Sequence, residues 1–368
     1  LTRDEISLEE QAASSFIKTI DNNGNNLQIG VITVPGFYQD YAARRRGEDD
    51  YKSTTSDVKK IVTEFKEIGI DGLVIDLRGN SGGLLDEATG LTGLFIDEGP
   101  VVQLKDMEDK IEIINDPIPG TIYDGPISVL IDRFSASASE IFAAAIQDYS
   151  RGIVIGQKSF GKGSVQNLYP LDRYSRYKSK SGFGQLTLTI AKFYRVNGSG
   201  TQNRGVIPDI VLPSFINENI VGEENKNNTL PWDEIASLIY DKNDELETTK
   251  ELVTKNFETR EKKNLSIQYI LEDIEYFKKE NEIDLITLNY DKRIKRRDNK
   301  QEEIEKRRKK RLMELGIDED KDFDDFRNEA ILDEVYSVMF DMISQRNYES
   351  VTSKLITLKE SNAEDSQS

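Results

Sequence analysis

The chain contains no cysteine and no histidine among its 368 residues. Without cysteine there are no thiol nucleophiles, disulfides, iron–sulfur clusters or thiolate zinc sites. Without histidine, neither a Ser-His-Asp nor a Cys-His mechanism can be assembled, and no metal can be held by imidazole. If the chain is a hydrolase, its general base must be Lys, Asp, Glu or a terminal amine. We therefore expect no metal and no other cofactor.

Positive charge and long apolar runs are also scarce. Lys and Arg number 49 against 67 Asp and Glu, which gives a formal net charge of −18. Such a surface repels nucleic acid and anionic membranes unless a local patch reverses its sign. No run of about 18 apolar residues occurs, so no membrane-spanning segment is expected. The lack of cysteine fits an oxidising compartment.

The first half of the chain alternates between two kinds of pattern. Apolar, β-branched runs predict strands, and apolar residues at helical spacing predict helices between them. The strands are expected at 28–35, 72–77, 100–104, 127–132, 152–156, 164–170 and 184–196, and the helices at 54–68, 84–96 and 137–149. This alternation predicts an α/β core around a largely buried sheet.

Composition changes near residue 215, because glycine almost disappears beyond Trp232 and the charged fraction rises. Helices are expected at 232–247, 266–280 and 328–345, with a possible returning strand at 285–290. We divide the chain into a first segment 1–9, an α/β core 10–215, a helical and highly charged extension 216–350, and a disordered tail 351–368. We expect residues 1–9 to be the last strand of a preceding part of the protein, and we expect the chain to be a fragment of a longer precursor.

Ser137 is the first candidate for chemistry. It starts a predicted helix directly after a buried strand and a tight turn, which exposes its hydroxyl beside the free N–H groups of the helix end. The backbone N–H of Ala138 could then receive a developing oxyanion. The common alternative is a capping box formed by Ser137 and Glu140. The two interpretations are compatible.

Lys162 is the second candidate, because Gly161 and Gly163 flank it in a loop between two strands. A solvated lysine is charged at neutral pH, so a role as base requires burial that favours the neutral amine. The glycines would let the backbone close around that amine. Gln166, on the following strand, could orient the amine through its amide oxygen. The ordinary alternatives are an exposed loop lysine and a strand glutamine.

The glycine-rich loop 80–83 can bring a backbone N–H close to a reacting centre, although it would also serve as a simple strand-to-helix turn. Together, residues 132–140 (DRFSASASE), 160–166 (FGKGSVQ), 77–83 (LRGNSGG) and 205–209 (GVIPD) resemble the carboxyl-terminal processing, or tail-specific, serine proteases. Blocks at 34–38, 192–198 and 230–233 resemble the long periplasmic Prc/Tsp-like branch of that family. The resemblance extends from residue 1 to about residue 345.

The resemblance implies a role for each candidate residue. Ser137 would be the nucleophile, Lys162 the general base and Gln166 its orienting partner. The N–H groups of Gly83 and Ala138 would form the oxyanion hole, and Asp148 falls where some members have a supporting acid. The implied fold is a crotonase/Clp-protease-like core with a mostly helical C-terminal extension.

The resemblance also implies an activity. It is that of a Ser-Lys serine endopeptidase cleaving proteins with apolar, exposed C-terminal tails, for processing or degradation in the periplasm or cell envelope. An envelope lipoprotein adaptor is a partner that the family allows. Residues 1–9 would be the remaining strand of a PDZ module, most of which lies outside this chain. The main alternative is a non-catalytic peptide-binding protein on the same fold.

Two other patterns point to different functions. Residues 156–162 resemble a P-loop, but Gly163 stands where that motif needs Ser or Thr, and a strand follows where it needs a helix. Residues 292–311 hold 12 Lys or Arg against 4 Asp or Glu. We interpret them as a solvated helix with acidic residues preceding basic ones, and no aromatic residues interleave there as in nucleic-acid binding. No nucleic-acid partner is expected.

Overall fold

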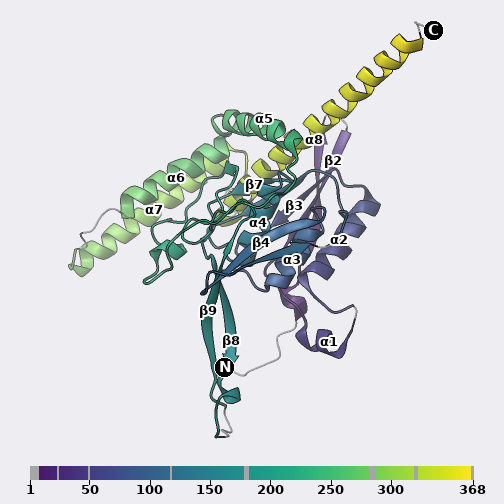
Figure 1. The fold of residues 1–368 in the computed structure, drawn as a ribbon. Helices are drawn as coiled ribbons and strands as arrows, with labels where there is room; N and C mark the ends of the chain where they lie inside the picture. Colours follow the sequence, from purple (N-terminus) through teal and green to yellow (C-terminus); the bar gives the residue numbers. More distant parts are fainter. Residues whose placement is uncertain are drawn as a thin grey trace.

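The computed structural model describes residues 8–22, 25–48, 50–116, 118–177, 182–281, 285, 287–318 and 322–365. Its main sheet has six strands in the order β1-β2-β3-β6-β7-β10 (Figure 1). These are β1 (Ser14–Asn22), β2 (Asn25–Thr33), β3 (Gly72–Asp76), β6 (Ile127–Ile131), β7 (Ile153–Gly156) and β10 (Ile210–Val211). β1 runs antiparallel to β2, and the other neighbours pair in parallel.

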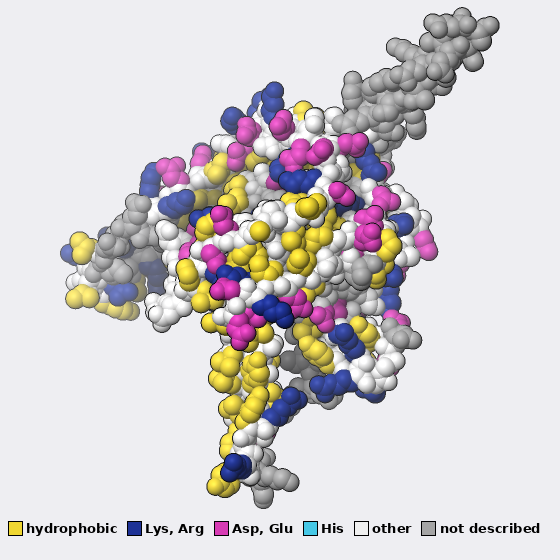
Figure 2. Space-filling view, viewed as in Figure 1, with side chains coloured by type: hydrophobic (Ala, Val, Ile, Leu, Met, Phe, Trp, Pro, Cys, Tyr) yellow, Lys and Arg dark blue, Asp and Glu magenta, His cyan; other side chains and the backbone are white. Residues whose placement is uncertain are grey.

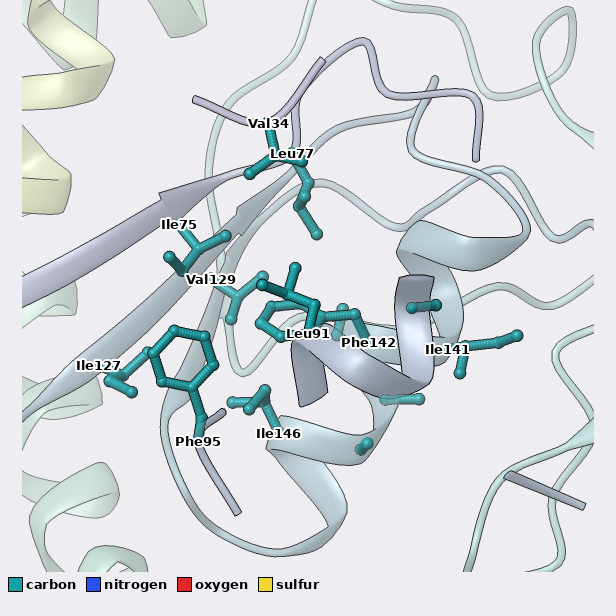
Figure 3. Close-up of a cluster of buried hydrophobic side chains, with 14 of the residues drawn as sticks. Val34, Ile75, Leu77, Leu91, Phe95, Ile127, Val129, Ile141, Phe142 and Ile146 are labelled. Carbon is teal, nitrogen blue, oxygen red and sulfur yellow. The ribbon is translucent and has the colours of Figure 1, made fainter. Parts of the chain in front are cut away.

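Helices cover both faces of this sheet, which is why β3, β6 and β7 are buried along their whole length. One face carries α2 (Thr54–Ile68), α3 (Leu85–Gly93) and α4 (Ala138–Asp148). In the cluster of Figure 3, Leu91 and Phe142 from these helices meet Ile75 and Val129 from the strands. The intervening strand residue Val74 points to the other face, where it joins Met339 of α8 (Phe323–Asp365).

A second, four-stranded sheet has the order β5-β4-β9-β8 and is entirely antiparallel. It comprises β4 (Gly99–Asp106), β5 (Ile111–Asp116), β8 (Ser164–Pro170) and β9 (Gln185–Tyr194). The β8–β9 hairpin extends away from the body of the molecule (Figure 1). The short helix α1 (Tyr41–Arg46) lies beyond β2 in the sequence. The predicted α/β core is thus confirmed, and so is its helical extension.

The extension consists of α5 (Asp244–Glu261), α6 (Leu265–Asn281), α7 (Tyr290–Glu314) and α8. It is not detached from the core, because Met339 and Ile343 of α8 lie against Gly72 of β3. A side chain at Gly72 would meet the terminal methyl of Met339, which would have to move aside, so glycine favours the close approach of helix and sheet. Within the described residues, no helix is long and apolar enough to cross a membrane.

The predicted helix at 232–247 is wrong over most of its length, since α5 begins only at Asp244. Residues 233–238 instead run extended beside Val196–Gly200. There the N–H groups of Ile235 and Leu238 donate to the carbonyls of Gly198 and Val196 at 2.9 and 2.8 Å. Backbone pairing with this loop therefore overrides the helical spacing of the apolar residues.

The possible strand at 285–290 is not formed by its described residues. Asn289 caps α7 by accepting a hydrogen bond from the N–H of Lys292, and Tyr290 is already helical. Near the N-terminus, Leu8–Gln11 form a 3-10 helix, and residues 1–7 of the predicted strand lie outside the described part. At the other end, α8 continues to Asp365 where a disordered tail was predicted. No glycine or proline interrupts that stretch.

Candidate active site

Ser137 lies in a sharp turn between β6 and α4. Its φ of 58° is uncommon for a residue with a side chain and marks backbone strain. Asp132 stabilises the turn, because its carboxylate accepts hydrogen bonds from the N–H groups of Phe134 and Ser135 at 2.9 and 3.0 Å. Ser135 in turn donates its hydroxyl to the carbonyl of Leu77 at the end of β3. The turn therefore presents a half-exposed serine at the start of a helix, as predicted.

Glu140 joins the Ser137 turn to the loop that carries Lys162. Its side chain is fully buried, and one carboxylate oxygen accepts the N–H of Ser137 at 2.8 Å and the N–H of Lys162 at 2.9 Å. The two nitrogens consequently lie within about 6 Å of each other. The other oxygen accepts the N–H of Gly161 at 2.7 Å and the hydroxyl of Ser159 at 2.5 Å. A single side chain thus fixes both candidate residues.

The charge state of Glu140 is finely balanced. Burial raises the pKa of Glu140 to about 7, although the hydroxyl of Ser159 and the backbone N–H groups of Ser137, Gly161 and Lys162 act to lower it. All four neighbours are donors, so the arrangement suits the ionised carboxylate. Protonation would place a hydrogen between an oxygen and a donor and break at least one of these bonds.

Lys162 is half-exposed in the loop between β7 and β8, so it is less buried than the sequence argument requires of a lysine base. Close backbone packing shapes this loop. A side chain at Gly163 would come within 2.6 Å of the backbone nitrogen of Gln202, and the N–H of Gly163 donates to the Gln202 side chain at 2.9 Å. Gln166 lies on β8 opposite Thr189 and is exposed. Among the hydrogen bonds between described residues, none joins the Lys162 amine to Ser137 or Gln166.

The glycine-rich loop lies directly against the Ser137 turn. Asn80 is buried, its side-chain oxygen accepts the N–H of Gly82 at 2.9 Å, and its carbonyl accepts the N–H of Ala136 at 3.0 Å. A side chain at Gly82 would come within 2.8 Å of the Ser137 Cβ and 3.2 Å of the Ala138 nitrogen. The loop can approach this closely only because it has glycine there.

Gly83 and Ala138, the residues predicted to supply the oxyanion donors, directly follow Gly82 and Ser137, which lie in close contact. Gly83 has φ +149° and lies so close to Phe37 that an added Cβ would come within 2.2 Å of the Phe37 carbonyl oxygen. Its neighbours Gly82 and Leu84 bond to Phe37 through the Gly82 carbonyl and the Leu84 N–H. In the described part of the chain, the N–H groups of Gly83 and Ala138 donate to no acceptor. Both N–H groups are available to a substrate carbonyl.

Asp148 does not join the site. It ends α4, eleven residues after Ser137, which corresponds to about 16 Å along a helix. Its carboxylate accepts two hydrogen bonds from Arg195 at 3.0 and 2.6 Å and one from Asn197 at 2.8 Å. Burial raises the pKa of Asp148, although Arg195 opposes that shift. This position assigns it to anchoring the end of β9 rather than to supporting Lys162.

Arg133 was not singled out from the sequence, yet it contributes to the same assembly. Its side chain is 1% exposed, and its guanidinium donates to the carbonyls of Ser159 and Val221 and pairs with Glu224. It therefore ties the Ser137 turn to the beginning of the Lys162 loop. No metal-binding cluster of three acidic side chains occurs within the described residues.

Comparison with known proteins places this geometry in a family. Residues 28–212 match the model described as Peptidase family S41, and residues 216–344 match the C-terminal domain of tail specific protease (DUF3340). The tail-specific protease of Haemophilus influenzae is 43% identical over 246 residues, or 65% of this chain and 32% of that protein. The carboxy-terminal-processing protease of Bartonella bacilliformis is 38% identical over 225 residues, or 57% of this chain and 50% of that protein.

The chain thus spans a third to a half of the length of these curated relatives. A solved structure, the photosystem II D1 C-terminal processing protease, is similar with a TM-score of 0.44 and 25% identity, covering 54% of this chain and 48% of that one. The family resemblance read from the sequence motifs is confirmed. This chain belongs to peptidase family S41.

Proposed function

We propose that this chain is the catalytic part of a serine endopeptidase in which Ser137 is the nucleophile and Lys162 the general base. The observation that carries the proposal is the Glu140 carboxylate, because one of its oxygens bonds the backbone of both residues. A nucleophile and a base that must exchange a proton need such a fixed mutual position. The membership of family S41 supports the same assignment.

The reaction proceeds through an acyl-enzyme. In this scheme the Lys162 amine takes the proton of the Ser137 hydroxyl as the serine oxygen attacks the scissile carbonyl carbon. The carbonyl oxygen becomes an oxyanion and accepts hydrogen bonds from the N–H groups of Gly83 and Ala138. Lys162 then gives its proton to the leaving amine, and water releases the acyl group with Lys162 as base again. Gln166 orients the amine in this scheme.

The substrates we propose are proteins with apolar, exposed C-terminal tails, processed or degraded in the periplasm or cell envelope. The support comes from the printed names of the relatives, which are tail-specific and carboxy-terminal-processing proteases. Since the chain spans only a third to a half of those proteins, tail selection is itself part of the proposal, with residues 1–9 proposed as the end of a PDZ module. An envelope lipoprotein adaptor fits the same setting.

The test is covalent labelling of Ser137 by a serine-directed phosphonate, located by mass spectrometry. We expect a single adduct on Ser137 that Ser137→Ala abolishes and that Lys162→Ala slows by roughly a hundredfold or more. Lys158→Ala is the matched control, because Lys158 lies in the same loop but pairs with Glu224. An unlabelled Ser137 in the folded chain would favour the non-catalytic peptide-binding alternative.

A further inference from the structure

The helices α6 and α7 form an arm that extends from the body of the molecule (Figure 1). They run antiparallel, as ion pairs between them show. Near the body, Arg311 pairs with Glu272 and Asp273, and toward the free end Lys300 pairs with Glu280. Arg307 also pairs with Asp273. In the inner half of the basic stretch 292–311, Arg307 and Arg311 therefore stabilise the arm itself.

The outer half is different. Residues 292–300 hold six Lys or Arg and one Asp in a chain whose net charge is −18. Within the described part of the chain, four exposed cations there form no ion pair, namely Lys292, Arg293, Lys295 and Arg296. Here the local sign of charge is reversed, which is the condition under which an acidic protein can approach an anionic surface.

Three of these cations line a hollow. It has a volume of about 420 Å³, and Lys292, Lys295 and Arg296 contribute to its wall together with Lys300 and Tyr276. Positions 292, 295 and 296 fall on one side of a helix. The wall also holds two acidic side chains, Glu280, which is paired with Lys300, and Glu303, so its four cations outnumber its two carboxylates and leave a net positive charge. The hollow is thus suited to a phosphate group.

Large apolar side chains stand beside this basic patch. Leu285 is 86% exposed, Leu288 96% and Tyr290 75%, all at the free end of the arm. Figure 2 shows apolar and basic side chains together at that end. Three such residues in six positions contribute nothing to the core, and a nucleic-acid backbone offers them no apolar partner. A lipid interface offers both an apolar layer and phosphates.

We propose that the end of the arm docks on the surface of an anionic lipid bilayer. Lys292, Lys295 and Arg296 bind the phosphate headgroups, while Leu285 and Leu288 enter the interfacial layer and Tyr290 lies at the headgroup level. Attachment is peripheral and leaves the core facing the solvent. This inference does not depend on the proposed proteolytic activity.

The test is co-sedimentation of the full chain with phosphatidylcholine vesicles, with and without phosphatidylglycerol. We expect binding only to the vesicles that contain phosphatidylglycerol, and we expect added salt to weaken it. Lys292→Glu with Lys295→Glu should reduce the binding constant by roughly thirtyfold or more, because each cation near such a surface contributes about a factor of five. Leu285→Ser with Leu288→Ser should reduce binding to the same vesicles without changing the charge.

Two control variants test whether vesicle binding depends on the end of the arm rather than on the total charge or the total exposed apolar surface. Lys306→Glu with Lys309→Glu has the same spacing and charge change on the inner half of α7, and Ile220→Ser with Ile239→Ser removes two exposed apolar side chains elsewhere. Both control variants should bind like the wild type. The proposal is overturned if the wild type binds no anionic vesicles, if neutral vesicles bind it equally, or if the controls lose as much binding as the arm variants. A shift of labelled duplex DNA without vesicle binding also overturns it.

Discussion

The two ends of helix α4 hold two buried carboxylates with opposite surroundings. Glu140, in the first turn, faces only a hydroxyl and three backbone N–H groups. Asp148, at the last residue, faces the guanidinium of Arg195 and the amide of Asn197. Burial raises the pKa of both carboxyls, and at Glu140 it outweighs the neutral donors and brings the pKa to about 7, whereas at Asp148 a fixed cation opposes it. We therefore expect the charge of α4 to change with pH near neutrality at Glu140, beside the serine, while the ion pair with Arg195 anchors the other end.

The largest effect is expected from Glu140→Ala. It leaves a hydroxyl and three backbone N–H groups without their acceptor in a buried place, and each such loss costs about 1–3 kcal/mol. The Lys162 loop should separate from the Ser137 turn, and the rate of phosphonate labelling should fall by roughly a hundredfold or more. Labelling kinetics and thermal unfolding measure the two effects.

If the alanine variant is too unstable to assay, Glu140→Gln is the second variant to measure, because it preserves the volume of the buried side chain. Its amide oxygen can replace one acceptor, but its NH₂ group faces donors, so the rate should fall between those of the alanine variant and the wild type. A Gln variant that labels as fast as the wild type would show that the carboxylate does not position the site.

The next largest effect is expected at Asp148, at the other end of α4. Asp148→Asn leaves the largely buried Arg195 without its charge partner, and breaking such a pair lowers the free energy of unfolding by about 3 kcal/mol. The rate of Ser137 labelling, measured well below the melting temperature, should change by less than about twofold. A large loss of labelling in a stably folded Asp148→Asn protein would restore the supporting-acid interpretation.

A third prediction concerns pH. Since the pKa of Glu140 is raised to about 7, the ionised form that the four donors require is lost below neutral pH. The labelling rate should therefore fall by up to about tenfold per pH unit below 7. This decrease of the labelling rate at acidic pH should be absent in Glu140→Gln. If the same decrease persists in that variant, it arises from the titration of another group.

The folding stability should respond to pH in the opposite direction to the labelling rate. A carboxyl group whose pKa is higher in the folded than in the unfolded chain binds its proton more tightly when folded, so its contribution to stability falls as pH rises from about 4.5 to 7. Comparing the pH dependence of the melting temperature in the wild type and in Glu140→Gln isolates this contribution. We expect the difference between the two proteins to shift in favour of the variant as pH rises through this window.

The sequence was a reliable guide where local pattern and tertiary role agree. The buried strands, the helix 54–68 and the turn at Ser137 carry their signals within a few residues. Glu140 was recognised only as half of a capping box, because no local pattern reveals that its carboxylate also meets residues 159–162. Arg133 left no signal for the same reason. The helix predicted at 232–247 failed because its competitor, the backbone of residues 196–200, lies far away in the sequence.

The smallest effect is expected at Gln166, which is exposed on β8, so its replacement should not alter stability. If its amide oxygen orients the Lys162 amine during reaction, Gln166→Ala should slow labelling by about tenfold at every pH, because a neutral partner is lost and no charge changes. Asn167→Ala is the matched control, since Asn167 is equally exposed but points to the opposite face of the strand. Equal rates for the two variants would make Gln166 an ordinary strand residue and leave Glu140, acting through the backbone, as the group that positions Lys162.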